Sequence, residues 1–420
     1  MKSHFSHKFF SLLTLSLALA LSFGWGNAQE PKVIYVYDDL GRLMQVVNQN
    51  NDCATYEYDA VGNLLSITRG TNCLQSPTIT SLSPDSGTAG ETTCVAITGT
   101  NFLGATVTTD NPQIQISRTR VADTSIDACL NISPFSPIGP TRIVVNTLAG
   151  SSDQIFTVNP RPVVLTQSTT IGPTDQRFDD TLLTIEGSAT VTIDGTHRFA
   201  SLTLRNGAVL THSPATANTV GKLDIRVIGA LTIDAASRID VTGRGFLGGG
   251  RPGNPFGSTG MTIGFQQGST GKSGGSYGGL GGVSEGTPNP VYGDFRDPNE
   301  PGSGGGGGGG SGGGLVRIVA QTVQLDGSIV ADGGNYTGDG AGGSGGGVRV
   351  DAGTLRGTGL VRANGGRGQF YGGGGGGGRI AIYFQDATGF DFAGVAAIGG
   401  AGSDGRPNGQ NGTIHLEQRF

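Results

Sequence analysis

Aliphatic residues in the C-terminal part of the chain recur in pairs two positions apart, with polar residues between them and Gly, Asp or Asn at the breaks. A period of two places alternate side chains on one face of a strand, so the pattern predicts short strands that bury one face. The pairs include Leu183 with Ile185, Val191 with Ile193, Leu202 with Leu204, Ile225 with Val227, Leu231 with Ile233 and Ile239 with Val241.

Three later segments repeat this pattern at a nearly fixed interval. They read SGGGLVRIVAQTVQLDGSIVADGG, SGGGVRVDAGTLRGTGLVRANGG and GGGGRIAIYFQDATGFDFAGVAAIGG, and their Arg317, Arg349 and Arg379 stand 32 and 30 residues apart. Regular recurrence on this scale predicts a solenoid, here a right-handed parallel β-helix over residues 159–420. One coil alone could not offset its ordering entropy, whereas stacked coils bury a continuous aliphatic ladder.

Glycine supplies 78 of the 420 residues and forms runs such as Gly304–Gly310 and Gly372–Gly378. Such runs are either disordered loops or polyproline-II-like segments whose missing side chains permit close backbone contact. Both runs directly precede a predicted strand, which favours ordered packing. The region resembles the glycine-rich, pectate-lyase-like β-helix domains of bacterial surface and adhesin-type proteins, in SRIDVTGRGFLGGG, SGGGLVRI and GQNGTIHLEQ. That resemblance implies a fold and a surface setting, but no defined activity.

Residues 76–158 read as a small immunoglobulin-like sandwich, with alternating strands separated by Ser, Pro and Gly turns. The segment resembles the IPT/TIG domain, whose opening pattern is S-P-x-x-G-x-x-G followed by I-T-G-x-N-F. The resemblance implies a spacer or adhesion module. The matching residues are Ser83, Pro84, Gly87, Gly90, Gly99, Asn101 and Phe102.

Residues 29–75 contain a duplication, YVYDDLGRL from Tyr35 and YEYDAVGNL from Tyr56. Alternating aromatics suit a strand, and Asp followed three residues later by Gly suits a turn, so each copy predicts a β-hairpin. The copies resemble the YD repeat of the Rhs and teneurin family, although Asn63 stands where the family pattern has Arg. Two copies cannot close the hollow β-shell that long arrays form, because repeat arrays need about three units to bury a core.

Residues 1–28 have the features of a secretory signal peptide: Lys2 and Lys8, an apolar run from residue 9 to 23, and small residues before a cleavage point after Ala28. No later segment is long and apolar enough to span a membrane. The predicted location is therefore extracellular or on the cell surface, with the periplasm as an alternative.

The remaining cysteines are even in number, which predicts disulfides in an oxidising compartment. If Val95 and Leu130 face the core of the sandwich, strand alternation turns Cys94 and Cys129 outward, where they could pair. We therefore expect Cys94 with Cys129. The other expected pair, Cys53 with Cys73, would bridge the two hairpins. Four cysteines allow three pairings, and the sequence alone does not choose between them.

Charge and composition narrow the function. The net charge is −5, which argues against nucleic acid as a partner. Five aspartates sit at predicted turns, where Asp commonly caps backbone groups, and no carboxylate pair can be assigned acid and base roles. These are Asp194, Asp234, Asp240, Asp326 and Asp332. The sequence thus favours a structural or adhesion protein that binds carbohydrate or protein partners. The alternative is a polysaccharide lyase or hydrolase of the pectate-lyase-like class.

Two sets of residues are candidates for ligand chemistry. The loop DGGNYTGDG supplies Asp332, Asn335 and Asp339, and GGAGSDG supplies Asp404 in a fragment resembling one calcium-binding repeat, so calcium is the candidate metal, and no other cofactor is predicted. The alternative is polar turn residues facing solvent.

The second set is the repeated arginines Arg317, Arg349 and Arg379, which would point outward and could bind acidic sugars. Stacked like charges repel, so such a ladder needs acidic partners or a ligand; solvated edge positions are the alternative. Tryptophan is confined to Trp25 in the signal peptide, and tyrosines could provide sugar-stacking surfaces in its place, namely Tyr292, Tyr336, Tyr371 and Tyr383.

Overall fold

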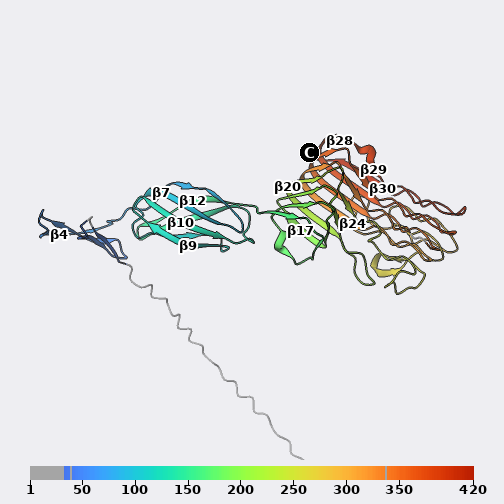
Figure 1. Ribbon diagram of the computed structural model, residues 1–420, viewed down its shortest axis with the longest axis horizontal. Helices are drawn as coiled ribbons and strands as arrows, with labels where there is room; N and C mark the ends of the chain where they lie inside the picture. The colour runs from blue at the N-terminus through green and yellow to red at the C-terminus, as the bar shows by residue number, and fades with distance from the viewer. Residues whose placement is uncertain (1–32, 38–39, 336–337) are drawn as a thin grey trace, which may run out of the picture. The chain divides into compact units, whose positions relative to one another are not determined.

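The structure is a computed structural model and describes residues 33–37, 40–335 and 338–420 (Figure 1). The predicted signal peptide and Tyr336 lie outside the described residues. Within the described part, every regular element is a strand except for three single-turn 3₁₀ helices, so the all-β prediction is confirmed. The 3₁₀ turns are Gln176–Phe178, Ile263–Phe265 and Phe392–Gly394.

Each YD copy forms a hairpin, as predicted. The four strands pair antiparallel in chain order. In the second copy, Asp59 closes the turn: its Oδ1 accepts hydrogen bonds from the backbone N–H groups of Val61 and Asn63 at 3.0 and 2.7 Å. Gly62 has a φ of 96°, which few other residues tolerate. The strands are β1 (Ile34–Tyr37), β2 (Leu43–Val47), β3 (Asp52–Tyr58) and β4 (Leu64–Thr71).

The disulfide of this sheet joins Cys53 to Cys73. Cys53 lies on β3 opposite Gly70 of β4, and Cys73 follows the end of β4. The bond therefore closes the open end of the second hairpin. The expected pairing is confirmed, but our expectation that it bridges the two hairpins was wrong, because Cys53 lies on β3 and Cys73 directly follows β4 of the same hairpin.

Residues 78–159 form two four-stranded sheets around one apolar core. Cys94 and Cys129 lie directly opposite each other on β7 and β10 and form a disulfide on the outer face, as strand alternation predicted. Gly99 of the IPT/TIG pattern has a steric role, because a Cβ there would lie 1.9 Å from the carbonyl oxygen of Thr78. One sheet has the order β5 (Thr78–Ser83), β7 (Thr92–Thr100), β10 (Ser125–Ile132), β9 (Ile114–Val121). The other has the order β6 (Ser86–Thr88), β12 (Gly150–Asn159), β11 (Gly139–Thr147), β8 (Thr106–Thr109).

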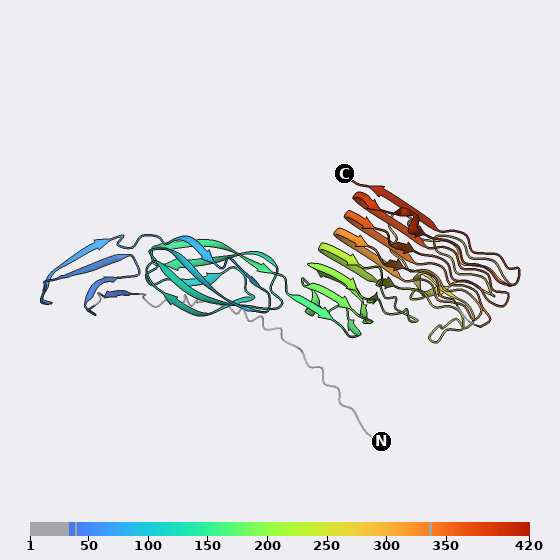
Figure 2. The same ribbon diagram turned by 45° about the horizontal axis from the view of Figure 1, so that its top comes forward.

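Residues 162–418 form the β-helix, whose strands belong to two large parallel sheets (Figure 2). The nine-stranded sheet contains β13 (Pro162–Leu165), β15 (Leu182–Glu186), β18 (Ser201–Arg205), β20 (Leu223–Ile233), β24 (Leu315–Leu325), β26 (Gly347–Gly357), β28 (Arg379–Phe390) and β30 (Thr413–Gln418), with β17 (Gly195–Phe199) beside β20. The seven-stranded sheet contains β14 (Thr169–Ile171), β16 (Thr190–Ile193), β19 (Val209–Thr211), β21 (Arg238–Asp240), β25 (Ser328–Val330), β27 (Leu360–Arg362) and β29 (Val395–Ala396). A two-residue pair, β22 (Met261–Thr262) with β23 (Gln266–Gln267), lies in a loop.

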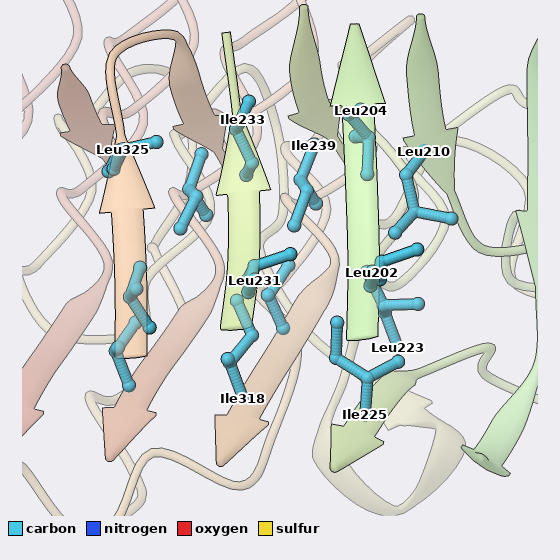
Figure 3. Packing of buried hydrophobic residues seen from close by; sticks show 14 of the residues in the cluster. Leu202, Leu204, Leu210, Leu223, Ile225, Leu231, Ile233, Ile239, Ile318 and Leu325 are labelled. Carbon is cyan, nitrogen blue, oxygen red and sulfur yellow. The ribbon is translucent and has the colours of Figure 1, made fainter. Parts of the chain in front are cut away.

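Register stacks the aliphatic residues of successive coils into ladders. Leu202, Leu231 and Val323 are partners on β18, β20 and β24, and all three are fully buried. Figure 3 shows Leu202 and Leu231 beside each other on neighbouring strands. Burying each such side chain contributes about 1.5 to 3 kcal/mol to the stability of the fold. The aliphatic residues that recur at every second position are therefore the chief source of the stability of the β-helix.

The glycine runs pack in ordered layers rather than forming loose loops. In the last coils, backbone hydrogen bonds form both within and between the glycine segments: the N–H of Gly375 donates to the oxygen of Gly366 at 2.9 Å, that of Gly400 to Gly375 at 2.8 Å, and that of Gly409 to Gly400 at 2.9 Å. These glycines are not in the left-handed region, as expected for polyproline-II-like segments. We call the packed segments Gly302–Gly314, Gly340–Gly347, Gly365–Gly378 and Gly399–Gly412 the glycine bundle. The prediction of ordered packing is confirmed.

Many of the buried glycines in the glycine bundle have no room for a side chain. A Cβ on Gly375 would lie 1.9 Å from the carbonyl oxygen of Gly343, and one on Gly374 would lie 1.9 Å from that of Gly400. Real Cβ atoms do not approach backbone so closely, and the neighbouring atoms are themselves fixed by hydrogen bonds. Only glycine fits at these positions, because the backbone segments lie too close together for a residue with a Cβ atom.

Substitution Gly375→Ala should destabilise the β-helix by about 2 kcal/mol or more, because the added methyl group forces hydrogen-bonded segments apart. Thermal unfolding followed by circular dichroism measures the effect. Gly172→Ala is the matched control, since a Cβ there meets nothing within 4 Å and its φ is not left-handed. Equal melting temperatures for the two variants would contradict the packing described.

Candidate functional site

Two of the three repeated arginines form the expected ladder. Arg317 and Arg349 are register partners on β24 and β26. Arg379 is not the third rung, because β28 places Ala381 opposite Arg349 and sets Arg379 opposite Gly347. The spacing of 30 residues, against 32 for the first step, shifts Arg379 two positions along its strand. Arg379 is also buried, so the expectation of three outward arginines in one ladder was wrong.

A loop of residues 289–301, which we call the crossing loop, lies against this face. Asp297 Oδ1 accepts a hydrogen bond from Nη1 of Arg317 at 2.7 Å and from Nη1 of Arg349 at 2.6 Å. Its neighbour Pro298 accepts a second bond from Arg317 at 2.9 Å. The acidic partner that stacked arginines require is therefore supplied by the chain itself.

The crossing loop also explains the burial of Arg379. Nε of Arg379 donates to the carbonyl oxygen of Tyr292 at 2.9 Å, and its guanidinium carbon lies 5.4 Å from the ring centre of Tyr277. The same loop accepts a hydrogen bond from the Tyr383 hydroxyl at the carbonyl of Arg296. Strands β24, β26 and β28 are thus tied together from outside by one segment.

Asp297 stays ionised in this setting. Burial works against ionisation, but the hydrogen bonds from Arg317 and Arg349 outweigh it and hold the pKa of Asp297 below its ordinary value of 3.8. Sequence reasoning did not find Asp297, because this residue lies in an insert between repeats, where no periodic pattern marks its position.

Next to this ladder is a hollow of about 210 Å³ bordered by Val319, Asp351, Tyr383 and Arg419. Its aromatic ring is not free for a sugar, because Tyr383 is only 4% exposed and the guanidinium of Arg419 lies 3.5 Å from the ring centre. Its carboxylate, Asp351, is paired with Arg349 at 2.7 Å and with Arg419 at 3.1 Å.

Asp194 and Asp234, two of the five aspartates at predicted turns, cap backbone groups. Asp194 accepts from the backbone N–H and the hydroxyl of Ser213 at 2.8 and 2.6 Å, and Asp234 accepts from the backbone N–H of Asn206 at 2.7 Å. A second hollow, of about 390 Å³, is lined by Asp194 but by no other carboxylate. Neither of these two hollows contains the pair of carboxylates that a glycoside hydrolase needs as general acid and general base.

The four residues expected to bind calcium each have a different protein partner. Asp332 pairs with Arg362 at 2.9 Å, and burial raises its pKa. The side-chain oxygen of Asn335 accepts a hydrogen bond from the backbone N–H of Arg367, and Asp404 accepts one from the backbone N–H of Tyr371. Asp339 forms an ion pair with Lys272. Across the residues that the structure describes, no three His, Cys, Asp or Glu side chains gather in a metal-binding group.

The tyrosines proposed as stacking surfaces also differ from one another. Tyr292 is hydrogen-bonded to the carbonyl of Pro301 and lies 4.8 Å from Tyr277, ring centre to ring centre. Tyr371 is 53% exposed and follows Phe370, which is 59% exposed. Of the tyrosines named from the sequence and described here, Tyr371 is the one that is more than half exposed.

Two family matches cover the N-terminal part of the chain. Residues 37–72 match the RHS Repeat family, and residues 77–164 match the IPT/TIG domain family. No curated protein matched the chain. No helix in the described part is long and apolar enough to cross a membrane.

The fold and these matches define a class: a multidomain all-β protein with an RHS repeat, an IPT/TIG domain and parallel sheets of the β-helix type. The RHS repeat and IPT/TIG domain indicate a structural or adhesion protein of the surface or secreted kind. The two disulfides are consistent with an extracellular or surface location.

Substitution Asp297→Asn should lower the free energy of unfolding by about 0.5 to 1 kcal/mol at pH 7, a modest value because Asp297 is half exposed. The folded-state pKa lies below 3.8, so the stabilisation is present above that pH and is lost as the pH falls through the folded pKa. Denaturant unfolding at pH 7 and pH 3 should therefore show the difference from wild type shrinking in acid. Asp294→Asn, in the same loop, is the control; an equal effect there would show that the arginine bridge is not the cause.

Calcium binding at Asp332, Asn335, Asp339 and Asp404 stays a prediction. If calcium binds only the folded chain, millimolar CaCl₂ should raise the melting temperature relative to EGTA by mass action. Differential scanning fluorimetry at matched ionic strength, with MgCl₂ as the control, measures this. An unchanged melting temperature would reject calcium at these residues.

Proposed function

We propose that this protein is a secreted or cell-surface adhesion protein that binds extracellular carbohydrate or protein partners through its β-helix. The observation that carries the proposal is the ordered glycine bundle. Figure 2 shows its segments running alongside one another beyond the ends of the strands. Their glycines are largely buried, so the extension is built almost entirely from backbone.

A backbone-only extension suits display. Each coil is lengthened without side chains, and the lateral hydrogen bonds between glycine segments fix the positions of the loops that connect them. Binding residues placed on a rigid support lose less entropy when a partner binds than residues on a free loop. The turns between glycine segments are therefore well placed to present side chains to a partner.

Other observations support export and a structural role. The predicted signal peptide precedes a chain with two disulfides, which form and persist in oxidising compartments. The arginines of the nine-stranded sheet are engaged by the crossing loop, and the capping aspartates by backbone groups. Binding is accordingly proposed for the loops of the glycine bundle and not for the arginine ladder.

The proposal predicts that the full chain, purified with its disulfides intact and labelled with a fluorophore, binds to bacterial cells or to their extracellular polysaccharide in a saturable manner. Flow cytometry and pull-down with the extracted polysaccharide measure binding. The variant Gly375→Ala, which disturbs the glycine bundle, should bind more weakly, whereas Gly172→Ala should bind like wild type. Absence of saturable binding to cells and to polysaccharide would contradict an adhesion role.

A further inference from the structure

Residues Gln369–Gly372 form a turn, which we call the aromatic turn, within the glycine bundle. The N–H of Gly372 donates to the carbonyl oxygen of Gln369 at 3.0 Å. The two central residues, Phe370 and Tyr371, have φ values of 46° and 66°. Tight turns with two positive φ angles are formed preferentially by Asn and Gly, because a Cβ is crowded in this conformation. Two successive aromatic residues are sterically unfavourable here.

Four contacts from distant segments hold the strained backbone in place. The N–H of Tyr371 donates to Asp404 Oδ2 at 2.9 Å, and the Tyr371 carbonyl accepts from the hydroxyl of Ser284 at 2.6 Å. The N–H of Gln369 donates to the carbonyl of Gly340 at 2.9 Å, and the N–H of Ser403 to that of Gly372 at 3.1 Å. The conformation is therefore imposed by the surrounding structure, which is the situation in which strain points to a function.

The strain keeps two aromatic rings in solvent. Phe370 is 59% and Tyr371 is 53% exposed, although the bundle beside them is buried backbone. Neither ring contributes to the large apolar core of the β-helix. An Asn-Gly turn would satisfy the same backbone without strain and without exposed rings, so stability alone does not account for this pair.

Two cations lie over the Tyr371 ring, and carboxylates pair with them. The ammonium of Lys272 lies 5.9 Å and the guanidinium carbon of Arg406 lies 5.7 Å from its centre. Lys272 pairs with Asp339 at 2.8 Å, and Glu285 lies 3.6 Å from Lys272 and 3.7 Å from Arg406. Beside the Tyr371 ring there are thus hydrogen-bond donors and acceptors that ion pairs already hold in position.

This combination matches the chemistry of a sugar. A pyranose ring offers apolar C–H faces for an aromatic ring and hydroxyl groups at its edge for charged donors and acceptors, the mixture typical of ligand sites. The local charges do not favour a polyanion, because two cations, Lys272 and Arg406, stand beside three carboxylates, Glu285, Asp339 and Asp404. A neutral carbohydrate fits the balance better than an acidic one.

We infer that the aromatic turn is a binding site for neutral carbohydrate, in which Phe370 and Tyr371 stack on the sugar and Lys272, Arg406 and Asp339 contact its hydroxyl groups. This inference deepens the proposed adhesion function and rests on it. The site is built from three parts of the chain that the glycine bundle brings together, residues 272–285, 339–340 and 369–406.

The test uses the full chain with the double substitution Phe370→Asn and Tyr371→Gly, which removes both rings and supplies the residues that the turn favours. Binding to an array of immobilised neutral and acidic oligosaccharides, followed by titration of the best neutral sugar, measures affinity; thermal unfolding measures stability. We expect affinity for the neutral sugar to fall about tenfold or more. The melting temperature should stay equal or rise by about 2 °C, since strain is relieved.

Two further variants separate stacking from general damage. Tyr371→Phe keeps the ring and should retain most of the affinity. Phe135→Ala removes an equally exposed aromatic ring from the IPT/TIG domain and should leave sugar binding unchanged. Loss of affinity together with unchanged or increased stability is a pattern that a merely structural role for the turn would not produce.

Three results would overturn the inference: no neutral sugar bound by the wild-type chain, binding to acidic sugars alone, or equal affinity in the Asn-Gly variant. The cell-binding assay distinguishes this failure from failure of the proposed function. If labelled wild-type chain and Asn-Gly variant both adhere to cells, adhesion stands and the aromatic turn is not its site. If adhesion is abolished by protease treatment of the cells and not by periodate, the partner is a protein and the sugar site is rejected.

Discussion

The β-helix depends on one constraint: every coil must lie in register on the previous one, about 4.8 Å away, so that backbone groups pair from coil to coil. In the strands this pairing leaves side chains free to alternate, and ladders such as Leu202, Leu231 and Val323 fill the interior. In the glycine bundle the same coil spacing continues where segments are packed on several sides, and at buried glycines such as Gly374 and Gly375 even a methyl group does not fit. The same coil spacing therefore favours aliphatic residues in the strands and glycine in the glycine bundle.

Patterns that follow from local geometry could be predicted from the sequence. Period-two alternation gave the strands, the outward positions of Cys94 and Cys129, and the hairpins of the YD copies. The glycine runs were expected to be ordered because each precedes a strand, and lateral hydrogen bonds between segments such as those of Gly375 and Gly400 bear this out. These inferences succeed because each depends on residues within one coil or one hairpin.

Features that depend on inserts or on exact register could not be predicted. A spacing two residues shorter was enough to take Arg379 out of the ladder, and the partner of Arg317 and Arg349 turned out to be Asp297, which lies in an insert with no period. The pairing of Cys53 with Cys73 was predicted correctly, but its place within one hairpin was not, since spacing does not reveal which strand end Cys73 follows.

The two exposed regions of the β-helix follow opposite principles. On the arginine ladder, carboxylates offset the repulsion between the stacked arginines. Asp297 bridges Arg317 and Arg349, and Asp351 pairs with Arg349 and Arg419. That face is explained by stability alone. At the aromatic turn, by contrast, Phe370 and Tyr371 occupy a conformation and an exposure that stability opposes, while fixed contacts from Ser284 and Asp404 prevent relaxation. Because proteins depart from local structural preference chiefly at functional sites, this departure supports the proposal that the aromatic turn is the binding region.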